Sequence, residues 1–517
     1  MLEKVNEFHS RREKIKLGGG LKLIERQHEM KKLTPWERVE RLLDPGTFYD
    51  INSFAKSQST GFGMDKRETP ADGVICGYGE IAGRKVVVYA VDFTVMAGAY
   101  GEGTLVKTNQ ALEFGGKTGI PIVGLIDSSG IRFQESNEAL YAFGKLFRSH
   151  SIYSGVMPQI TALMGPCVAG QAYSPVLSDF LIMVKNTSYM WLASPILTKV
   201  ATGEEVTDTE LGGPDVHMEK SGTCDLIAED DEDCLEKIKR VLSFLPQNYR
   251  ELPPLTDPKD DPNRREERLL EILPANPKKP YDIRQIIYEV MDNGDFFELK
   301  PDYAKNIVIG FGRLNGRTVG IVANQPMFMA GGMEPDCSDK YTKFITICDA
   351  YNIPLITFVD TTAFLPGKHF EEIGVLRHGA KILHAYSVTT VPKIQLIIRR
   401  CYGGANMVMG SKGMGADLCF AWPTAEISPT GAEGAVAIIY RKQIAQAENP
   451  EEERKRLVKE YFDKKIQVYT HAEAVRYGLV DDIIDPRDTR PVLIKALDML
   501  SSKKESIPEK RRAIPPQ

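Results

Sequence analysis

The alternation of apolar and polar positions along the chain predicts two β-hairpins far apart in the sequence. Residues 74–81 and 85–91 form two apolar runs separated by a short glycine-containing turn, a pattern typical of neighbouring antiparallel strands. The runs at 307–314 and 318–322 repeat this arrangement. Between them, Asn315-Gly316 favours a type I′ turn, because both residue types tolerate a positive φ. We therefore expect both halves of the chain to begin a sheet in the same way.

Each hairpin is followed by a helical pattern and then by another apolar strand. The helical patterns cover about residues 104–117 and 338–351, and the strands after them end at Asp127 and Asp360. Strands that alternate with helices predict an α/β domain with a largely buried sheet. Because the loops at strand ends carry the chemistry of such domains, we expect functional residues just after these aspartates.

The matching features lie at a constant spacing. Pro121 and Pro354 are 233 positions apart, and so are the two aspartates. A constant offset over several pairs is hard to obtain by chance and indicates a duplicated domain. We predict an N-terminal domain at 1–252, a proline-rich, charged linker at 253–280 and a C-terminal domain at 281–517.

Composition and charge exclude several classes of protein. The chain has 517 residues, 42% hydrophobic and 26% charged, which is enough for two ordinary cores. A formal net charge of −5 gives no reason to expect nucleic acid. We see no apolar run near the roughly 18 residues of a membrane span and no signal peptide, so we expect a cytoplasmic protein without direct membrane contact. The eight cysteines form no Cys-x-x-Cys pair, which favours buried thiols and predicts no bound metal.

Small residues follow an apolar strand at two matching places. Gly403-Gly404-Ala405 follow the run 392–398, and Ala169-Gly170 follow the corresponding run that starts at Pro158. Backbone N–H groups in such a bare segment can face a ligand without obstruction by side chains. Two of them aimed at one point form what we call a socket, which stabilises an oxygen that becomes negative during a reaction. Because the arrangement occurs twice, we favour a catalytic interpretation over an ordinary glycine turn.

The chain also carries short motifs that are specific in combination: Gly18-Gly19-Gly20, Leu42-Leu43-Asp44-Pro45-Gly46, Gly165-Pro166-Cys167, Phe364-Leu365-Pro366-Gly367, Arg377-His378-Gly379-Ala380-Lys381, Tyr402-Gly403-Gly404-Ala405 and Ala421-Trp422-Pro423-Thr424-Ala425-Glu426. Together they resemble the carboxyltransferase (β) subunits of biotin-dependent acyl-CoA carboxylases, above all the propionyl-CoA and acetyl-CoA carboxylase members, from about residue 10 to residue 500. The resemblance implies an α/β fold of two tandem crotonase-like domains and a homohexamer built as a trimer of dimers. It also implies an active site between the N-terminal domain of one protomer and the C-terminal domain of another.

The resemblance further implies the reaction and the groups that support it. A carboxyl group would move from N1 of carboxybiotin to the α-carbon of an acyl-CoA such as propionyl-CoA or acetyl-CoA. The backbone amides of Ala169 and Gly170 would hold the thioester oxygen, and those of Gly404 and Ala405 the carbonyl oxygen of biotin. No side-chain base is needed if carboxybiotin releases CO2 and its N1 then takes the α-proton. This agrees with the sequence, in which we find no Ser/His/Asp order or paired carboxylates.

Five further residues are candidates for substrate binding. Arg132, beside Gly130, suits a CoA phosphate because a guanidinium pairs with phosphate through two parallel bonds, and a structural salt bridge is the alternative. Phe364 and Leu365 are candidates for the biotin side, with core packing as the alternative. Met407 stands where propionyl-specific members of the family usually carry an aspartate. A flexible apolar side chain there reshapes the acyl pocket, so the identity of the acyl group stays open.

The sequence also bears on partners and on other functions. We find no Ala-Met-Lys-Met biotinylation site and no ATP-binding domain, so we expect a biotin carboxylase and a biotin carboxyl carrier protein on other chains, separate or fused as an α subunit. Biotin is then the expected cofactor and acyl-CoA the substrate. One alternative is the carboxyltransferase subunit of a sodium-pumping decarboxylase acting on methylmalonyl-CoA or glutaconyl-CoA. Another is a crotonase-type hydratase or hydrolase that works without biotin. A non-catalytic scaffold fits least, because both glycine sockets are intact.

Overall fold

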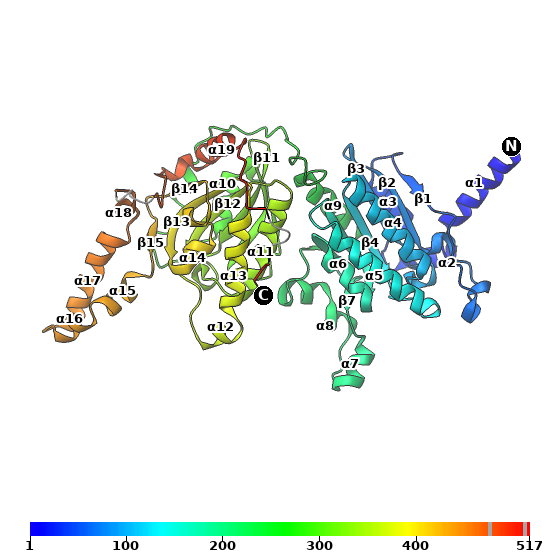
Figure 1. The fold of residues 1–517 in the computed structure, drawn as a ribbon, viewed down its shortest axis with the longest axis horizontal. Coiled ribbons are helices and arrows are strands. Elements are labelled where there is room, and N and C mark those ends of the chain that lie inside the picture. Colours follow the sequence, from blue (N-terminus) through cyan, green and yellow to red (C-terminus); the bar gives the residue numbers. More distant parts are fainter. Residues whose placement is uncertain (474–477, 510–513, 517) are drawn as a thin grey trace. The chain divides into compact units, whose positions relative to one another are not determined.

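The computed structural model describes residues 1–473, 478–509 and 514–516. The chain forms two compact units, Met1–Leu252 and Pro253–Gln517. Each unit contains a mixed β-sheet with helices packed against it (Figure 1). The α/β class predicted from the sequence is therefore confirmed.

The sheet of the first unit begins with the predicted hairpin. Its strands are β1 (Tyr49–Ile51), β2 (Val74–Ile81), β3 (Arg84–Val91), β4 (Ile122–Ser128), β5 (Gln159–Val168), β6 (Phe180–Val184), β7 (Tyr189–Trp191) and β8 (Leu226–Ala228). They lie in the order β1-β2-β3-β4-β5-β6-β8, and β7 pairs with β5. β2 and β3 are antiparallel, whereas β3 to β6 run parallel. Strands β4 and β6 are buried along their whole length, and so is β5 except at Pro166, as their apolar sequences require.

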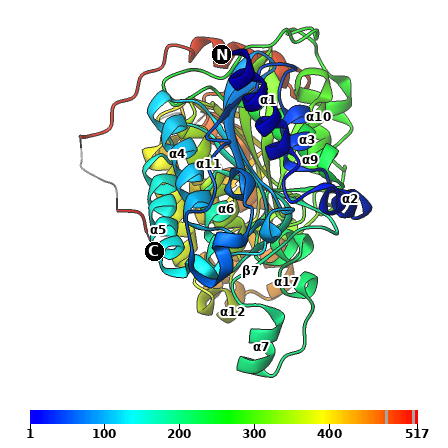
Figure 2. The same ribbon diagram turned by 90° about the vertical axis from the view of Figure 1, so that its right-hand side faces the viewer.

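Helices cover both faces of this sheet. They are α1 (Leu2–Lys16), α2 (Leu21–Glu29), α3 (Pro35–Leu42), α4 (Glu102–Thr118), α5 (Ser136–Ile152), α6 (Tyr173–Leu177), α7 (Pro195–Thr202), α8 (Asp208–Gly212) and α9 (Asp231–Phe244). α4 and α5 pack side by side on one face (Figure 2), and α3 and α9 contact each other and the strands on the opposite face. Pro35 begins α3, where Thr34 and Glu37 form a capping box.

The second unit repeats the first strand for strand. Its strands are β9 (Phe296–Leu299), β10 (Ile307–Leu314), β11 (Arg317–Asn324), β12 (Leu355–Thr361), β13 (Lys393–Tyr402), β14 (Leu418–Ala421), β15 (Glu426–Ser428) and β16 (Asp482–Ile483). They lie in the order β9-β10-β11-β12-β13-β14-β16, and β15 pairs with β13 just as β7 pairs with β5. The identical topology confirms the duplication indicated by the constant spacing.

The helices of the second unit include a group that extends from the sheet. The helices are α10 (Ile283–Val290), α11 (Pro335–Ala350), α12 (Lys368–Glu372), α13 (Val375–Val388), α14 (Gly403–Val408), α15 (Ala432–Ile439), α16 (Arg441–Gln446), α17 (Pro450–Lys465), α18 (Val468–Glu473) and α19 (Thr489–Met499). α11 and α13 pack together beside the sheet. α15, α16 and α17 contact one another and reach away from it (orange in Figure 1).

The segment 253–280, predicted as a linker, packs on the second unit. Leu269 is buried in the core of that unit, and Nη1 of Arg264 donates a hydrogen bond to the carbonyl of Glu289 in α10 at 3.0 Å. Arg265 binds Asp488 near the start of α19. These contacts attach much of the segment to the second sheet.

Candidate functional site

The two strands that carry the small-residue segments share an irregularity. In the first unit, Ile126 of β4 lies opposite Leu163 of β5, but Ser128 lies opposite Cys167, so four residues of β5 span two of β4. In the second unit the same shift occurs between β12 and β13. Such an insertion bends a strand and re-aims the residues that follow it. Both units therefore redirect the chain immediately before the predicted sockets.

The chain enters a short helix after each bent strand, and it does so in the same conformation. Ala169, the first residue of a short 3-10 helix that ends at Ala172, has φ +57°, and Gly403, the first residue of α14, has φ +60°. The structural counterpart of Ala169 is thus Gly403, one residue before the pair chosen from the sequence. A positive φ is costly for any residue that has a Cβ atom, which explains the glycine at position 403 and leaves Ala169 in an unfavourable backbone conformation.

Most of the N–H groups at the start of these helices are free to bind a ligand. The first N–H groups of a helix have no acceptor within it. In the part of the chain that the structure describes, the hydrogen bonds of turns, loops and side chains leave the N–H groups of Gly170, Gly404 and Ala405 unused, whereas the N–H of Ala169 continues the ladder between β5 and β7, in which Val168 lies opposite Trp191. No atom lies within 4 Å of the point where a side chain on Gly170 would begin, so its face is open.

A buried aspartate holds each bent strand in place. In the second unit, the carboxylate of Asp360 accepts hydrogen bonds from Nε of Arg399 and Nε of Arg400, both at 2.9 Å. In the first unit, Asp127 binds Nζ of Lys32 at 2.6 Å and Nη1 of Arg38 at 3.2 Å. The two aspartates are the residues that end β4 and β12 in the sequence prediction, but their cationic partners were missed.

The cations that bind the two aspartates come from different parts of the chain, because β5 and β13 carry different residues at the bend. In the first unit the position of Arg399 is taken by Gly165, where a Cβ atom would collide with the carboxylate of Asp127. The space is used by Lys32, which comes from the N-terminal segment. In the second unit the cations are on the bent strand itself. The pair Arg399-Arg400, shortly before the predicted socket, is the sequence signal that would have identified them.

The side chains proposed for the biotin side lie around the second socket. A Cβ on Gly404 would lie 3.5 Å from the ring of Phe364, so this half-buried ring lies against the socket. Leu365 packs towards Gly332, and its N–H donates to the carbonyl of Met333 at 2.8 Å. Met407 lies in α14 and is 50% exposed. Phe364 and Met407 are therefore available to a ligand at this place.

The residues proposed for CoA binding in the first unit lie behind the socket. The guanidinium of Arg132 is fully buried and pairs with Asp72 at 2.8 Å and Glu135 at 2.9 Å. Gly130 is buried beside Val168, and its N–H already donates to Ser128. For Arg132 the salt-bridge alternative is the one that the structure contains. Both residues are buried in this chain, and their contact with a CoA phosphate stays a prediction.

The described residues form neither a metal site nor a membrane-spanning helix. The described part of the chain contains no group of three His, Cys, Asp or Glu side chains that is able to hold a metal ion. None of the described helices has both the length and the apolar character needed to cross a bilayer. All eight cysteines are buried free thiols.

Comparison with known proteins gives full-length matches. The model of the carboxyl transferase domain family matches residues 26–514. The chain is 47% identical to the methylmalonyl-CoA decarboxylase subunit alpha of Propionigenium modestum, over 98% of each protein. It is 46% identical to the propionyl-CoA carboxylase carboxyltransferase subunit of Haloferax mediterranei, over 99% of this chain and 98% of that protein. The crystal structure of the transcarboxylase 12S hexamer with methylmalonyl-CoA and methylmalonic acid bound matches with a TM-score of 0.97 at 43% identity, covering 100% of this chain and 98% of that one.

Proposed function

This chain belongs to the carboxyl transferase family and is a carboxyltransferase with two tandem crotonase-like domains, and from that premise we propose how it works. It moves a carboxyl group between biotin on a carrier protein and the α-carbon of an acyl-CoA. The observation that supports this most is the pair of open N–H sockets, one in each unit, that follow identically bent strands. A reaction that develops negative charge on two different oxygens needs two such sockets.

Each socket has a separate role in the proposal. The N–H groups of Ala169 and Gly170 bind the thioester oxygen, which becomes negative when the α-carbon loses its proton. The N–H groups of Gly404 and Ala405 bind the ureido oxygen of biotin, which becomes negative when the carboxyl group leaves. Biotin, when bound, supplies the carboxyl group and the nitrogen that accepts the proton. The bare faces of Gly170 and Gly404 leave room for these groups, with the ring of Phe364 beside the second one; Leu365, the next residue, is proposed for the same side.

The acyl group of the proposed substrate is short. The transcarboxylase 12S structure has methylmalonyl-CoA bound, and the two relatives named above are a propionyl-CoA carboxylase and a methylmalonyl-CoA decarboxylase. These names support propionyl-CoA and its carboxylated product, methylmalonyl-CoA, as the reacting pair. Met407, half-exposed in the helix that begins at the second socket, is proposed to contact the acyl chain.

The direction of transfer has a second candidate. The Propionigenium modestum relative is named as a decarboxylase subunit and is about as similar as the carboxylase subunit, at 47% against 46% identity. In that role the chain would take the carboxyl group from methylmalonyl-CoA and pass it to biotin. Both directions use the same sockets.

Assembly and partners are part of the proposal. The hexamer of transcarboxylase 12S supports a homohexamer of this chain. A biotinylated carrier and, for net carboxylation, a biotin carboxylase act with it. We also propose a cytoplasmic location, supported by eight cysteines that all remain free.

The test uses the purified chain and a biotinylated carrier protein. We expect the chain to transfer the carboxyl group of methylmalonyl-CoA to the carrier, which mass spectrometry detects on the biotinylated peptide. Propionyl-CoA should form in equal amount, and no ATP should be needed. ATP-driven carboxylation by the chain alone, or hydration of an enoyl-CoA without biotin, would refute the proposal. Mass photometry of the same sample tests the hexamer.

A further inference from the structure

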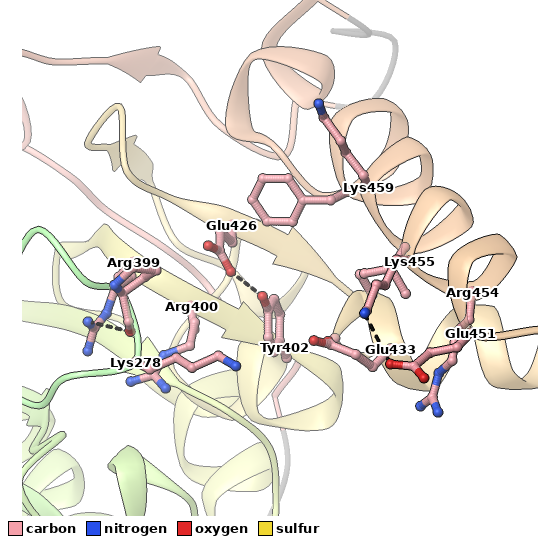
Figure 3. A pocket seen from close by; sticks show the side chains of 15 residues that line it. Lys278, Arg399, Arg400, Tyr402, Glu426, Glu433, Glu451, Arg454, Lys455 and Lys459 are labelled. Atoms are coloured by element: carbon pink, nitrogen blue, oxygen red, sulfur yellow. Dashed lines mark hydrogen bonds and ion pairs between the residues drawn. The ribbon is translucent and has the colours of Figure 1, made fainter.

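The second unit contains a large cavity that the proposed reaction does not use. It has a volume of about 660 Å³, which lies in the range of small-molecule sites. It is bounded by the end of β13, by β15 and by helices α15 and α17 (Figure 3). Gly404, Ala405, Phe364 and Met407 do not line it. The cavity is therefore separate from the groups assigned to the second socket.

Cations outnumber acids around this cavity. Its lining contains the six basic residues Lys278, Arg399, Arg400, Arg454, Lys455 and Lys459, against the three acids Glu426, Glu433 and Glu451. Two of the acids are already engaged, because Glu426 accepts a hydrogen bond from Tyr402 and Glu451 pairs with Lys455 at 3.0 Å. Figure 3 shows Lys278, Arg399 and Arg400 together on one side of the cavity. That side has a net positive charge.

Several donors on that side lack acceptors. Asp360 uses the Nε atoms of Arg399 and Arg400, and two carbonyls accept from Nη1 of Arg399. The side chain of Arg399 is only 4% exposed, yet its Nη2 has no hydrogen-bond acceptor within the described part of the chain, and the guanidinium lies over the ring of Tyr281, 5.0 Å from the centroid. Burying such a donor without an acceptor costs free energy. Among the residues that line the cavity, Figure 3 draws no hydrogen bond or ion pair from the terminal nitrogens of Arg400 or from the ammonium of Lys278.

The first unit shows that holding the bent strand does not require this excess charge. There two cations, Lys32 and Arg38, are balanced by two carboxylates, Asp127 and Asp231, in a closed cluster. The positions of Arg399 and Arg400 are occupied by Gly165 and Pro166, which carry no charge. In the second unit one carboxylate faces two guanidiniums. The surplus donors are thus a feature of the second repeat alone.

We propose that this cavity is a binding site for a small anion whose phosphate or carboxylate group contacts Arg399, Arg400 and Lys278. Guanidinium groups favour such ligands because their N–H bonds match the geometry of two oxygens. The remaining volume, towards Val458 and Phe462 of α17, accommodates the body of the ligand.

Isothermal titration of the full-length protein with pyrophosphate and with citrate, at constant ionic strength, tests this site. We expect saturable binding of one anion per chain for at least one probe, and the tighter probe identifies phosphate or carboxylate as the preferred group. Lys278→Gln should weaken it by about tenfold, the effect of losing one charge-assisted contact. Lys279→Gln is the matched control, because the neighbouring lysine undergoes the same charge change but does not line the cavity.

A double variant, Lys278→Gln with Arg400→Lys, extends the test while keeping the charge beside Asp360. It should bind at least about a hundredfold more weakly if the two contacts are independent. Equal effects of Lys278→Gln and Lys279→Gln would overturn the proposal, and so would the absence of saturable binding. Binding that saturating CoA or free biotin abolishes would also overturn it, because the anion would then occupy the substrate site.

Discussion

Asp360 accepts two hydrogen bonds from Arg400 at a single oxygen, one from the side-chain Nε at 2.9 Å and one from the main-chain N–H at 3.3 Å. The contact therefore fixes both the side chain and the backbone of a residue that lies three positions before Gly403. Because β13 is irregular there and lacks a full ladder with β12, the aspartate replaces part of the missing backbone pairing. It determines the direction in which the chain enters the second socket.

Replacement of Asp360 by asparagine should destabilise the protein strongly. The variant keeps the shape but leaves two largely buried guanidiniums without a carboxylate, and breaking a buried ion pair costs about 3 kcal/mol or more. Urea denaturation measures the loss of unfolding free energy, and carboxyl transfer should fall with it. Asp302→Asn is the control, since its pair with Lys305 is exposed and should contribute less than about 1 kcal/mol. Equal stability of the two variants would contradict the anchoring role.

Removal of the Ala405 N–H should slow carboxyl transfer. Substituting lactic acid at this position exchanges only the N–H for an oxygen, and no helical hydrogen bond is lost because Ala405 is in the first turn of α14. We expect a decrease in kcat of about a hundredfold or more, as for other donors to an oxyanion. The same exchange at Leu21, the first residue of α2, should leave kcat unchanged. A normal kcat for the Ala405 ester would remove this N–H from the mechanism.

Met407→Asp should change the preference among acyl-CoA substrates. An apolar contact that distinguishes acyl chains by one methylene contributes about 1–3 kcal/mol to selectivity. We expect the ratio of kcat/KM for propionyl-CoA to that for butyryl-CoA to change by about tenfold or more in a panel assayed with the biotinylated carrier. Met407→Leu, which keeps the site apolar, should change the ratio much less. An unaltered ratio in Met407→Asp would exclude Met407 from the acyl pocket.

His150 should make the protein sensitive to acid. Burial lowers the pKa of its imidazole from 6.5 to about 4, and Nδ1 lies 2.7 Å from Oε1 of Gln159. Between pH 6.5 and pH 4 the unfolded chain binds a proton that the folded chain does not, so the free energy of unfolding falls as the pH decreases through this window. The loss should reach about 3 kcal/mol. Denaturation of wild type and His150→Gln at several pH values measures it, with the exposed His9→Gln as control. Parallel curves for wild type and His150→Gln would contradict the prediction.

The sequence predicted those parts of the fold that depend on local patterns. Both hairpins and the strands ending near Asp127 and Asp360 were placed within a few residues, because apolar alternation and turn residues are local signals. The glycine-rich segments were found for the same reason. The cation partners of Asp127 were not, because Lys32 and Arg38 approach it only through tertiary packing.

Arg132 is a second residue whose surroundings could not be predicted from the local sequence. In the sequence this arginine stands next to a glycine in a loop, which suggested an open phosphate site. Only the folded chain brings Asp72 against it, from 60 positions away. The cavity lined by Lys278 and Arg400 was also beyond the sequence, since it depends on how the arm of α15 to α17 leaves the sheet.

The two buried aspartates differ in how far along the chain their cationic partners lie. Asp360 takes its partners from within 40 positions of its own chain segment, whereas Asp127 reaches back 89 positions to Arg38. The N-terminal segment therefore stabilises the first repeat through Lys32 and Arg38, which bind Asp127. Asp360 of the second repeat instead binds two arginines of the adjacent strand. Removal of the N-terminal segment would impair activation of the thioester first, because Asp127 would lose Lys32 and Arg38. The half that receives biotin would keep the ion pairs between Asp360 and its two arginines.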